Sequence, residues 1–227
     1  FDLPSKANAQ ATPGAVSTPA AASQAVELLE RASRRLAETE TVRFDLAVEG
    51  QTALDAEGNI LLKEAEGELR RPDRVRASFQ AQVLGQNVTL QLITIGVETW
   101  TTDLLTGEWQ PAPEEFAYRP SVLFDNQEGI GPVMSRVGQA ELLGDEEIDG
   151  REVYRVRAVV EESVIGPLTY ETMVGSPVTV DLWIDRETDD LVRAELREPS
   201  SEAKPEPATW TLELFDHGED VTIESPV

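Results

Sequence analysis

Residues 74–101, RVRASFQAQVLGQNVTLQLITIGVETWT, alternate apolar and polar side chains in two successive runs. In 75–83 every second residue is apolar, which is the period of a β-strand with one buried face. Gly85 and its polar neighbours predict a turn, and 88–92 repeats the alternation in a second strand. Gly96 predicts another turn before a third strand. The stretch therefore predicts an antiparallel β-meander with one apolar surface.

The same alternation returns along most of the chain. Together with the meander it predicts about ten antiparallel strands. The further strands are expected at 42–49, 60–70, 140–148, 153–160, 178–185, 192–197 and 210–214, with a short one at 109–111 and a closing one at 221–223. Gly67 stands in the middle of its strand and predicts a bend or bulge there. Each strand has one apolar face, so the sequence predicts a single-layer sheet covered on one side.

One long amphipathic helix is expected over residues 24–38, with Ser23 as its N-cap. Its apolar stripe consists of Val26, Leu29, Ala32 and Leu36. Shorter helical segments are expected around 120–124, 132–138 and 161–174. A sheet this wide must curl, so the fold class is α+β: one strongly curved antiparallel sheet, a half-barrel, with helices covering its concave face.

The sequence does not decide whether the concave side is filled by side chains or contains a cavity. Ala77, Ala81, Ala158 and Ala194 occupy inward positions where a packed core favours larger side chains. Small inward residues either let a helix approach closely, as dense interiors require, or leave an apolar cavity for an aliphatic ligand.

Two domain regions are expected. Residues 1–22 are rich in Ala, Pro, Ser and Thr and predict a flexible tether, either to an N-terminal anchor or simply an uninformative tail. Residues 23–227 form one folded domain. The chain starts at Phe1 without a methionine, so we expect a mature form whose export signal lies outside this sequence.

Composition excludes several classes of protein. The formal net charge is -24, with 43 acidic and 19 basic residues, so nucleic acid and anionic membranes are not expected as electrostatic partners. The chain has no cysteine, which excludes disulfides and thiolate chemistry. No apolar run approaches the ~18–20 residues that span a bilayer.

Candidate catalytic groups are few. His217 is the single histidine, and its place in a polar turn predicts a solvated side chain. The acidic runs 145–147 and 189–190 are expected at solvated hairpin ends, since their spacing does not match a calcium loop. We therefore expect no enzyme activity, no metal and no cofactor, although a pair of carboxylates for hydrolysis stays possible because such a partnership is spatial.

The order of several segments resembles a known family. These segments are AVELLERASRRLAETETVRFDLAVEG, GELRRPDRVRASFQ, VETWTTDLLTGEWQPAP, GDEEIDGREVYRVRA, PVTVDLWIDRETDDLVRAEL and TWTLELFDHGEDVTIESP. Over roughly residues 24–226 they are similar to the mycobacterial LppX/LprG group of lipoproteins. The resemblance implies a half-barrel like that of the periplasmic lipoprotein carriers, which hold acyl chains of lipids or lipoglycans in an apolar cavity. It also implies a cell-envelope location, an N-terminal lipid anchor and a possible membrane transporter as partner.

This reading predicts an extracytoplasmic carrier that sequesters acyl chains of a lipid or glycolipid. The residues expected to contact the ligand are Phe44, Leu46, Phe79, Leu90, Leu92, Leu123, Phe124, Val133, Met134 and Leu168. The short helical segments that glycines interrupt are expected to form its gate. The alternative is an envelope sensor or interaction domain on the same fold with a filled core, since fold does not determine function.

Overall fold

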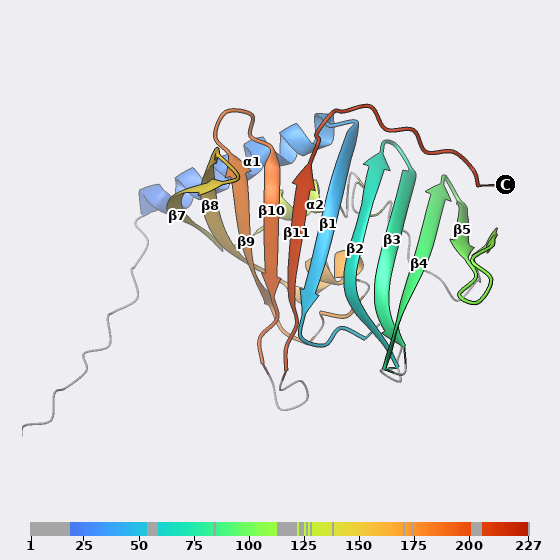
Figure 1. Ribbon diagram of the computed structural model, residues 1–227. Helices are drawn as coiled ribbons and strands as arrows, with labels where there is room; N and C mark the ends of the chain where they lie inside the picture. Colours follow the sequence, from blue (N-terminus) through green and yellow to red (C-terminus); the bar gives the residue numbers. More distant parts are fainter. Residues whose placement is uncertain are drawn as a thin grey trace, which may run out of the picture.

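A computed structural model describes residues 19–53, 59–83, 85–112, 122, 125, 127, 129–137, 139–169, 171–173, 175–200 and 206–226. Eleven strands form one antiparallel sheet in the order β6-β5-β4-β3-β2-β1-β11-β10-β9-β8-β7 (Figure 1). The strands are β1 (Thr41–Glu49), β2 (Ile60–Arg70), β3 (Arg74–Val83), β4 (Gln86–Ile95), β5 (Glu98–Thr102), β6 (Trp109–Pro111), β7 (Gln139–Ile148), β8 (Arg151–Val160), β9 (Val178–Asp185), β10 (Leu191–Arg197) and β11 (Thr209–Phe215).

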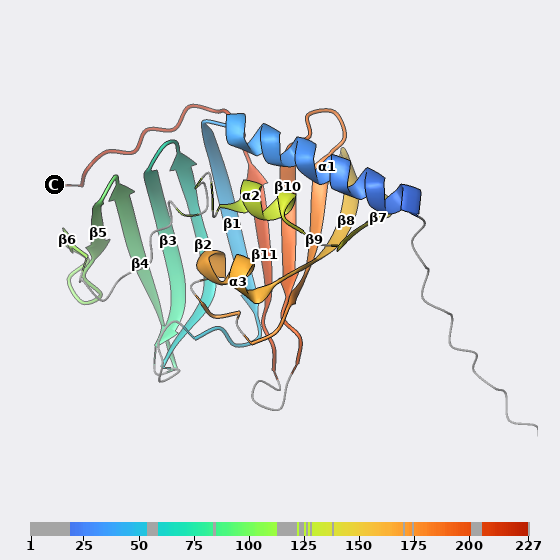
Figure 2. The same ribbon diagram turned by 180° about the vertical axis from the view of Figure 1, so that it is seen from behind.

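The sheet is curved and open, and the helices lie against its concave side. α2 (Ile130–Ser135), α3 (Glu162–Ile165) and the 3-10 helix η2 (Gly166–Thr169) cover the middle of that side. α1 (Pro19–Glu38) runs along one rim from β1 to β7 (Figure 2). The predicted α+β half-barrel is therefore confirmed, with eleven strands instead of about ten.

The first and the last strand meet in the middle of the sheet. β1 pairs with β11, and Phe44 faces Leu214 while Leu46 faces Leu212. On either side of this pair, neighbours in the sheet are neighbours in the chain. The whole sheet therefore consists of two meanders that only the β1–β11 pair joins.

α1 differs from its prediction in its start and in its buried face. The helix begins at Pro19, so residues 19–22 are helical instead of tether and Ser23 is not its cap. Residues 1–18 lie outside the described part of the chain. The buried stripe consists of Ala25, Leu28, Leu29, Ala32 and Leu36. Val26, predicted to be buried, is 40% exposed, because the stripe runs through the residue before it.

Gly67 serves close packing instead of the predicted bulge. It lies opposite Phe44 in β1, and a Cβ placed on it would lie 2.9 Å from the Phe44 ring. The register shift of β2 lies elsewhere, between Leu62 and Glu64. The missing side chain thus leaves room for the Phe44 ring beside the neighbouring strand.

The predicted closing strand at 221–223 is wrong, because this segment forms no ladder in the sheet. It is a strap held by arginines: Arg70 donates to the Val221 carbonyl at 2.9 Å and Arg74 to the Ile223 carbonyl at 2.7 Å. Both aliphatic side chains are buried in a small cluster with Ile93 and Trp100. The C-terminal end therefore covers an outer part of the sheet with apolar groups.

A single apolar face for every strand is also too simple. In β9 the outward residues Asp181 and Trp183 are buried as well as the inward ones. Trp183 packs with Val153 and Val192 in a second small cluster. The convex face of the sheet therefore has its own partly buried region, away from the main core.

Candidate functional site

An apolar cavity of about 100 Å³ lies between the concave face and the short helices. Its sheet side is lined from seven strands, by Phe44, Leu46, Ala65, Phe79, Val160, Val180, Leu182, Ala194, Leu196, Trp210 and Leu212. Its other side is lined by Ile130, Val133, Met134, Val137, Ile165, Leu168 and Thr169. The cavity thus has a rigid wall of strands and a cover of short helical segments.

One row of cross-strand neighbours explains why a space remains. Around the sheet the row reads Phe79, Ala65, Leu46, Leu212, Ala194 and Leu182, each directly opposite the next. Ala65 and Ala194 in this row have short side chains between larger neighbours, so they leave unfilled space above the sheet at their positions. Of the four alanines singled out in the sequence, Ala194 lines the cavity, whereas the other three do not.

Polar atoms are scarce in this lining, and those present are used. The Thr169 hydroxyl donates to the Ile165 carbonyl at 3.2 Å. The Trp210 indole N–H donates to the Thr52 hydroxyl at 2.9 Å. Neither group is left to recognise a polar ligand, because a buried polar group stays with its partner. The arrangement therefore suits hydrocarbon.

The cover is packed onto α1. Gly131 in α2 lies against α1, and a Cβ placed on it would meet the Ser33 carbonyl oxygen at 3.4 Å. Met134 of α2 is buried, as is Leu29 of α1, in the core cluster shared with the sheet. A glycine at this position allows the two helices to approach closely. The position of α2 therefore depends on the rim helix.

Six of the ten predicted contact residues line the cavity: Phe44, Leu46, Phe79, Val133, Met134 and Leu168. Leu90 and Leu92 do not, because they lie on β4 and the described lining ends at β3. Leu92 is fully buried opposite Ala77 and Thr101. Leu123 and Phe124 lie outside the described residues. Contact of the six with a ligand stays a prediction.

The site prediction missed the C-terminal half of the wall, including Leu182, Ala194, Trp210 and Leu212. Their inward phase is visible in the sequence, because each belongs to an alternating strand. What the sequence lacks is a signal that β11 pairs with β1, which places these residues beside Leu46. Alternation gives the face of a strand but not its neighbour.

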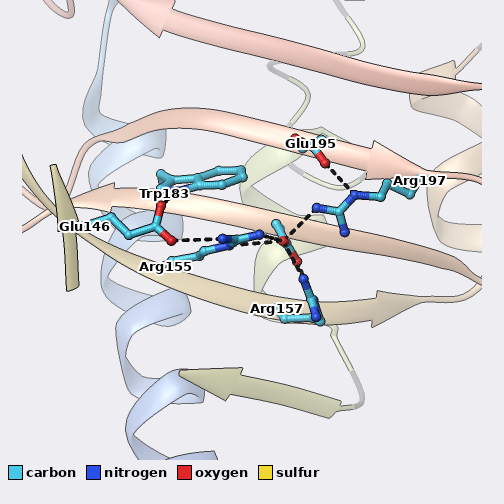
Figure 3. A network of polar contacts seen from close by, with 7 residues as sticks. Glu146, Arg155, Arg157, Trp183, Glu195 and Arg197 are labelled. Carbon is cyan, nitrogen blue, oxygen red and sulfur yellow. Dashed lines mark hydrogen bonds and ion pairs between the residues drawn. The ribbon is translucent and has the colours of Figure 1, made fainter. Parts of the chain in front are cut away.

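A polar network occupies the convex face behind β8, β9 and β10. The Asp181 side chain is completely buried and accepts hydrogen bonds from Arg155, Arg157 and Arg197 at 2.5–3.1 Å. Figure 3 shows the three arginines pointing toward this shared carboxylate. Burial by itself would raise the pKa of Asp181, but the arginine hydrogen bonds outweigh it and hold the pKa well below its ordinary value.

The network continues to Trp183 through two kinds of contact. Glu146 accepts from the Trp183 indole N–H at 2.7 Å and from Arg155 at 2.9 Å. The Arg155 guanidinium also lies 4.9 Å from the centre of the Trp183 ring, a cation–π distance. Each of these charged groups has an opposite partner, so the network ties β7, β8, β9 and β10 together as a structural element of the sheet.

One acidic run and the histidine are less solvated than predicted. Asp189 and Asp190 bind Arg31 and Arg35 of α1, at 3.1 and 2.7 Å, and so hold the rim helix. Residues 145–147 are exposed near the end of β7, just before the hairpin turn at 149–150, as predicted. His217 is half-buried with Nε2 3.1 Å from the Leu191 carbonyl oxygen, and burial lowers its pKa. Among the described residues, no group of acids and histidine is arranged to hold a metal ion.

A comparison with protein families decides where the chain belongs. The family model described as LppX_LprAFG lipoprotein matches residues 24–223. The chain belongs to this family. The match runs from α1 through the strap after β11, so it includes every strand of the LppX_LprAFG half-barrel. Among the described residues of this member, no helix has the length and apolar character needed to cross a bilayer.

The solved structures similar to this LppX_LprAFG protein include two mycobacterial lipoproteins. LprF from Mycobacterium bovis is 19% identical, with a TM-score of 0.71 over 92% of this chain and 98% of LprF. The lipoprotein LppX from Mycobacterium tuberculosis is 14% identical, with a TM-score of 0.63 over 89% of this chain and 99% of LppX. At these identities the likeness concerns the fold. A comparison with curated proteins finds no match.

Proposed function

We propose that this lipoprotein-family domain binds or carries lipid or lipoglycan outside the cytoplasm, by sequestering acyl chains between its concave sheet and its short helices. The observation that carries the proposal is the cavity lining, in which the polar atoms of Thr169 and Trp210 already have partners. Each methylene moved from water to such a site gains ~0.8 kcal/mol. Affinity then needs no polar recognition and no catalytic group.

The volume requires that the cover moves. A cavity of about 100 Å³ is smaller than the roughly 300–1,000 Å³ of pockets that enclose a whole small ligand. The proposed bound state is therefore one in which α2 and the α3–η2 segment have moved away from the sheet. An N-terminal lipid anchor in the envelope membrane and a membrane transporter partner belong to the same proposal.

Organic extraction of the purified chain followed by mass spectrometry tests the proposal. We expect an acylated lipid or glycolipid in stoichiometric amount. Ala194→Leu should lower the recovery of this lipid roughly tenfold or more, because the larger side chain fills part of the cavity that Ala194 lines. Ala47→Leu is the matched control, since Ala47 is exposed on the opposite face of the same sheet and its variant should retain the lipid.

The small cavity also favours one other function, an envelope sensor or interaction domain with a filled core. A lipid carrier and an interaction domain differ in the lipid that organic extraction recovers and in the uptake of lipid from vesicles. If the chain yields no lipid and takes up none from vesicles of acylated lipid, lipid carriage is rejected and the interaction domain stands. Equal recovery from wild type and Ala194→Leu would reject this cavity as the binding site.

A further inference from the structure

Two leucines are held out in water at the free edge of the sheet. The turn between β5 and β6, residues 103–108, presents Leu104 and Leu105 with 56% and 95% of their surfaces exposed. Figures 1 and 2 both place this turn at the end of the sheet opposite to β7 and α1. Single exposed apolar residues are common, but two adjacent leucines at one tip form a local apolar projection.

The turn is fixed by its own hydrogen bonds. The Asp103 carboxylate accepts from the backbone N–H groups of Leu105 and Thr106, at 2.9 and 2.8 Å, and from the Thr106 hydroxyl. Two backbone bonds close its base, from Gly107 to Asp103 and from Asp103 to Glu108. The leucines are thus ordered before any contact, which reduces the entropy cost of binding.

The surroundings of the tip select its partner. The outermost strand β6 has three residues and ends at Pro111, which removes a backbone donor and disfavours pairing with an added strand. A second copy of the chain is disfavoured by the net charge of -24. Trp109, half-buried directly behind the tip, is the residue type that lies at the boundary between water and lipid.

We propose that Leu104 and Leu105 insert into the surface of a zwitterionic lipid bilayer and orient this edge of the sheet toward it. The charged residues of the turn itself, Asp103 and Glu108, are both acidic. They disfavour an anionic surface, so contact is apolar and prefers neutral lipid. The proposal does not depend on the cavity, because vesicle binding is measured without any lipid transfer.

Co-sedimentation with phosphatidylcholine vesicles tests the insertion. We expect wild type to bind, and Leu104→Ser/Leu105→Ser to bind on the order of tenfold more weakly for each leucine that loses its contact. Leu143→Ser is the matched control, since Leu143 is 39% exposed on β7 at the opposite edge and its loss should change nothing. An unchanged thermal midpoint shows that the double variant is folded.

Asp103→Ala tests the role of order in the turn. It keeps both leucines but removes the carboxylate that fixes them, so binding should weaken without loss of apolar surface. Vesicles containing phosphatidylglycerol should bind wild type less at low salt, and added salt should reduce the difference. The proposal is overturned if wild type binds no vesicle, if the double variant binds as wild type does, or if anionic lipid strengthens binding. If wild type binds no vesicle, the remaining partner for the two leucines is an apolar pocket on another protein.

Discussion

Asp181 is a buried carboxylate on the convex face whose charge three arginines stabilise. Its carboxylate is completely buried, while its three arginine partners keep between 25% and 41% of their side chains exposed. If the carboxylate is removed, the arginine side chains can reorient toward solvent. Three positive charges then still lie close together without the negative charge that separates them. The stabilisation is therefore concentrated on one side chain.

Asp181→Asn should lower the free energy of unfolding at pH 7 by roughly 3–5 kcal/mol, the range for breaking a buried ion pair. Urea denaturation measures it. The matched control is Asp45→Asn on the same face. Burial and the neighbouring Glu66 and Glu213 raise the pKa of Asp45, so neutralising it removes repulsion and should leave stability unchanged or higher. Equal losses in both variants would contradict this assignment.

The effect of Asp181 should also depend on pH. Because the folded-state pKa lies below the ordinary value of about 3.9, the stabilisation is fully present above that value and is lost progressively as the pH falls from there toward the folded-state pKa. The difference in unfolding free energy between wild type and Asp181→Asn should therefore narrow as the pH falls from about 5 toward 2. A constant difference over this range would contradict the ion-pair origin.

At the scale of elements, the contact between α1 and α2 controls the proposed opening. A Cβ placed on Gly131 would lie 3.7 Å from the Ser33 Oγ, so side chains at these two positions are in contact. The chain has no cysteine, so Ser33→Cys/Gly131→Cys introduces one defined pair. The oxidised variant should take up no lipid from vesicles, and a reducing agent should restore uptake.

Each single cysteine variant is a control for this experiment, since neither can form the bond within the chain. Uptake of labelled lipid by the oxidised double variant at the rate of the reduced form would contradict a gate formed by α2. It would leave the α3–η2 segment, with Ile165 and Leu168 over the cavity, as the part that moves.

Elements were predictable where local chemistry defines them. Alternation predicts the strands, and the Asp–Gly pair at 149–150 is a dipeptide typical of a hairpin turn, which both residues adopt with positive φ. Prediction failed where the conformation of a segment depends on contacts with residues far away in the sequence. The 221–223 segment alternates like a strand, yet Arg70 and Arg74 take its carbonyl groups. The cavity was predictable as a kind of site, but its wall was not, because Leu212 becomes a neighbour of Leu46 only through the fold.

For the whole molecule, excess negative charge opposes the compact state. The chain has 43 acidic against 19 basic residues. Repulsion among the carboxylates therefore destabilises the folded state by more than the surface ion pairs stabilise it, at ~0–1 kcal/mol per pair. Raising NaCl from about 20 to about 500 mM should therefore raise the thermal midpoint by several degrees through screening. KCl should act equally. A fall in the midpoint would mean that the arginine ion pairs dominate.

The meeting of β1 and β11 has a consequence for biosynthesis. Strand β1 emerges from the ribosome early, while its neighbour β11 comes almost at the end of the chain. Until then the growing polypeptide has two separate ribbons, whose inner edges, on β1 and on β10, lack a partner strand. Bare edges attract other strands, and joining them late makes folding slow. Before its last strand forms, the nascent chain should therefore be prone to wrong strand pairing along those two edges.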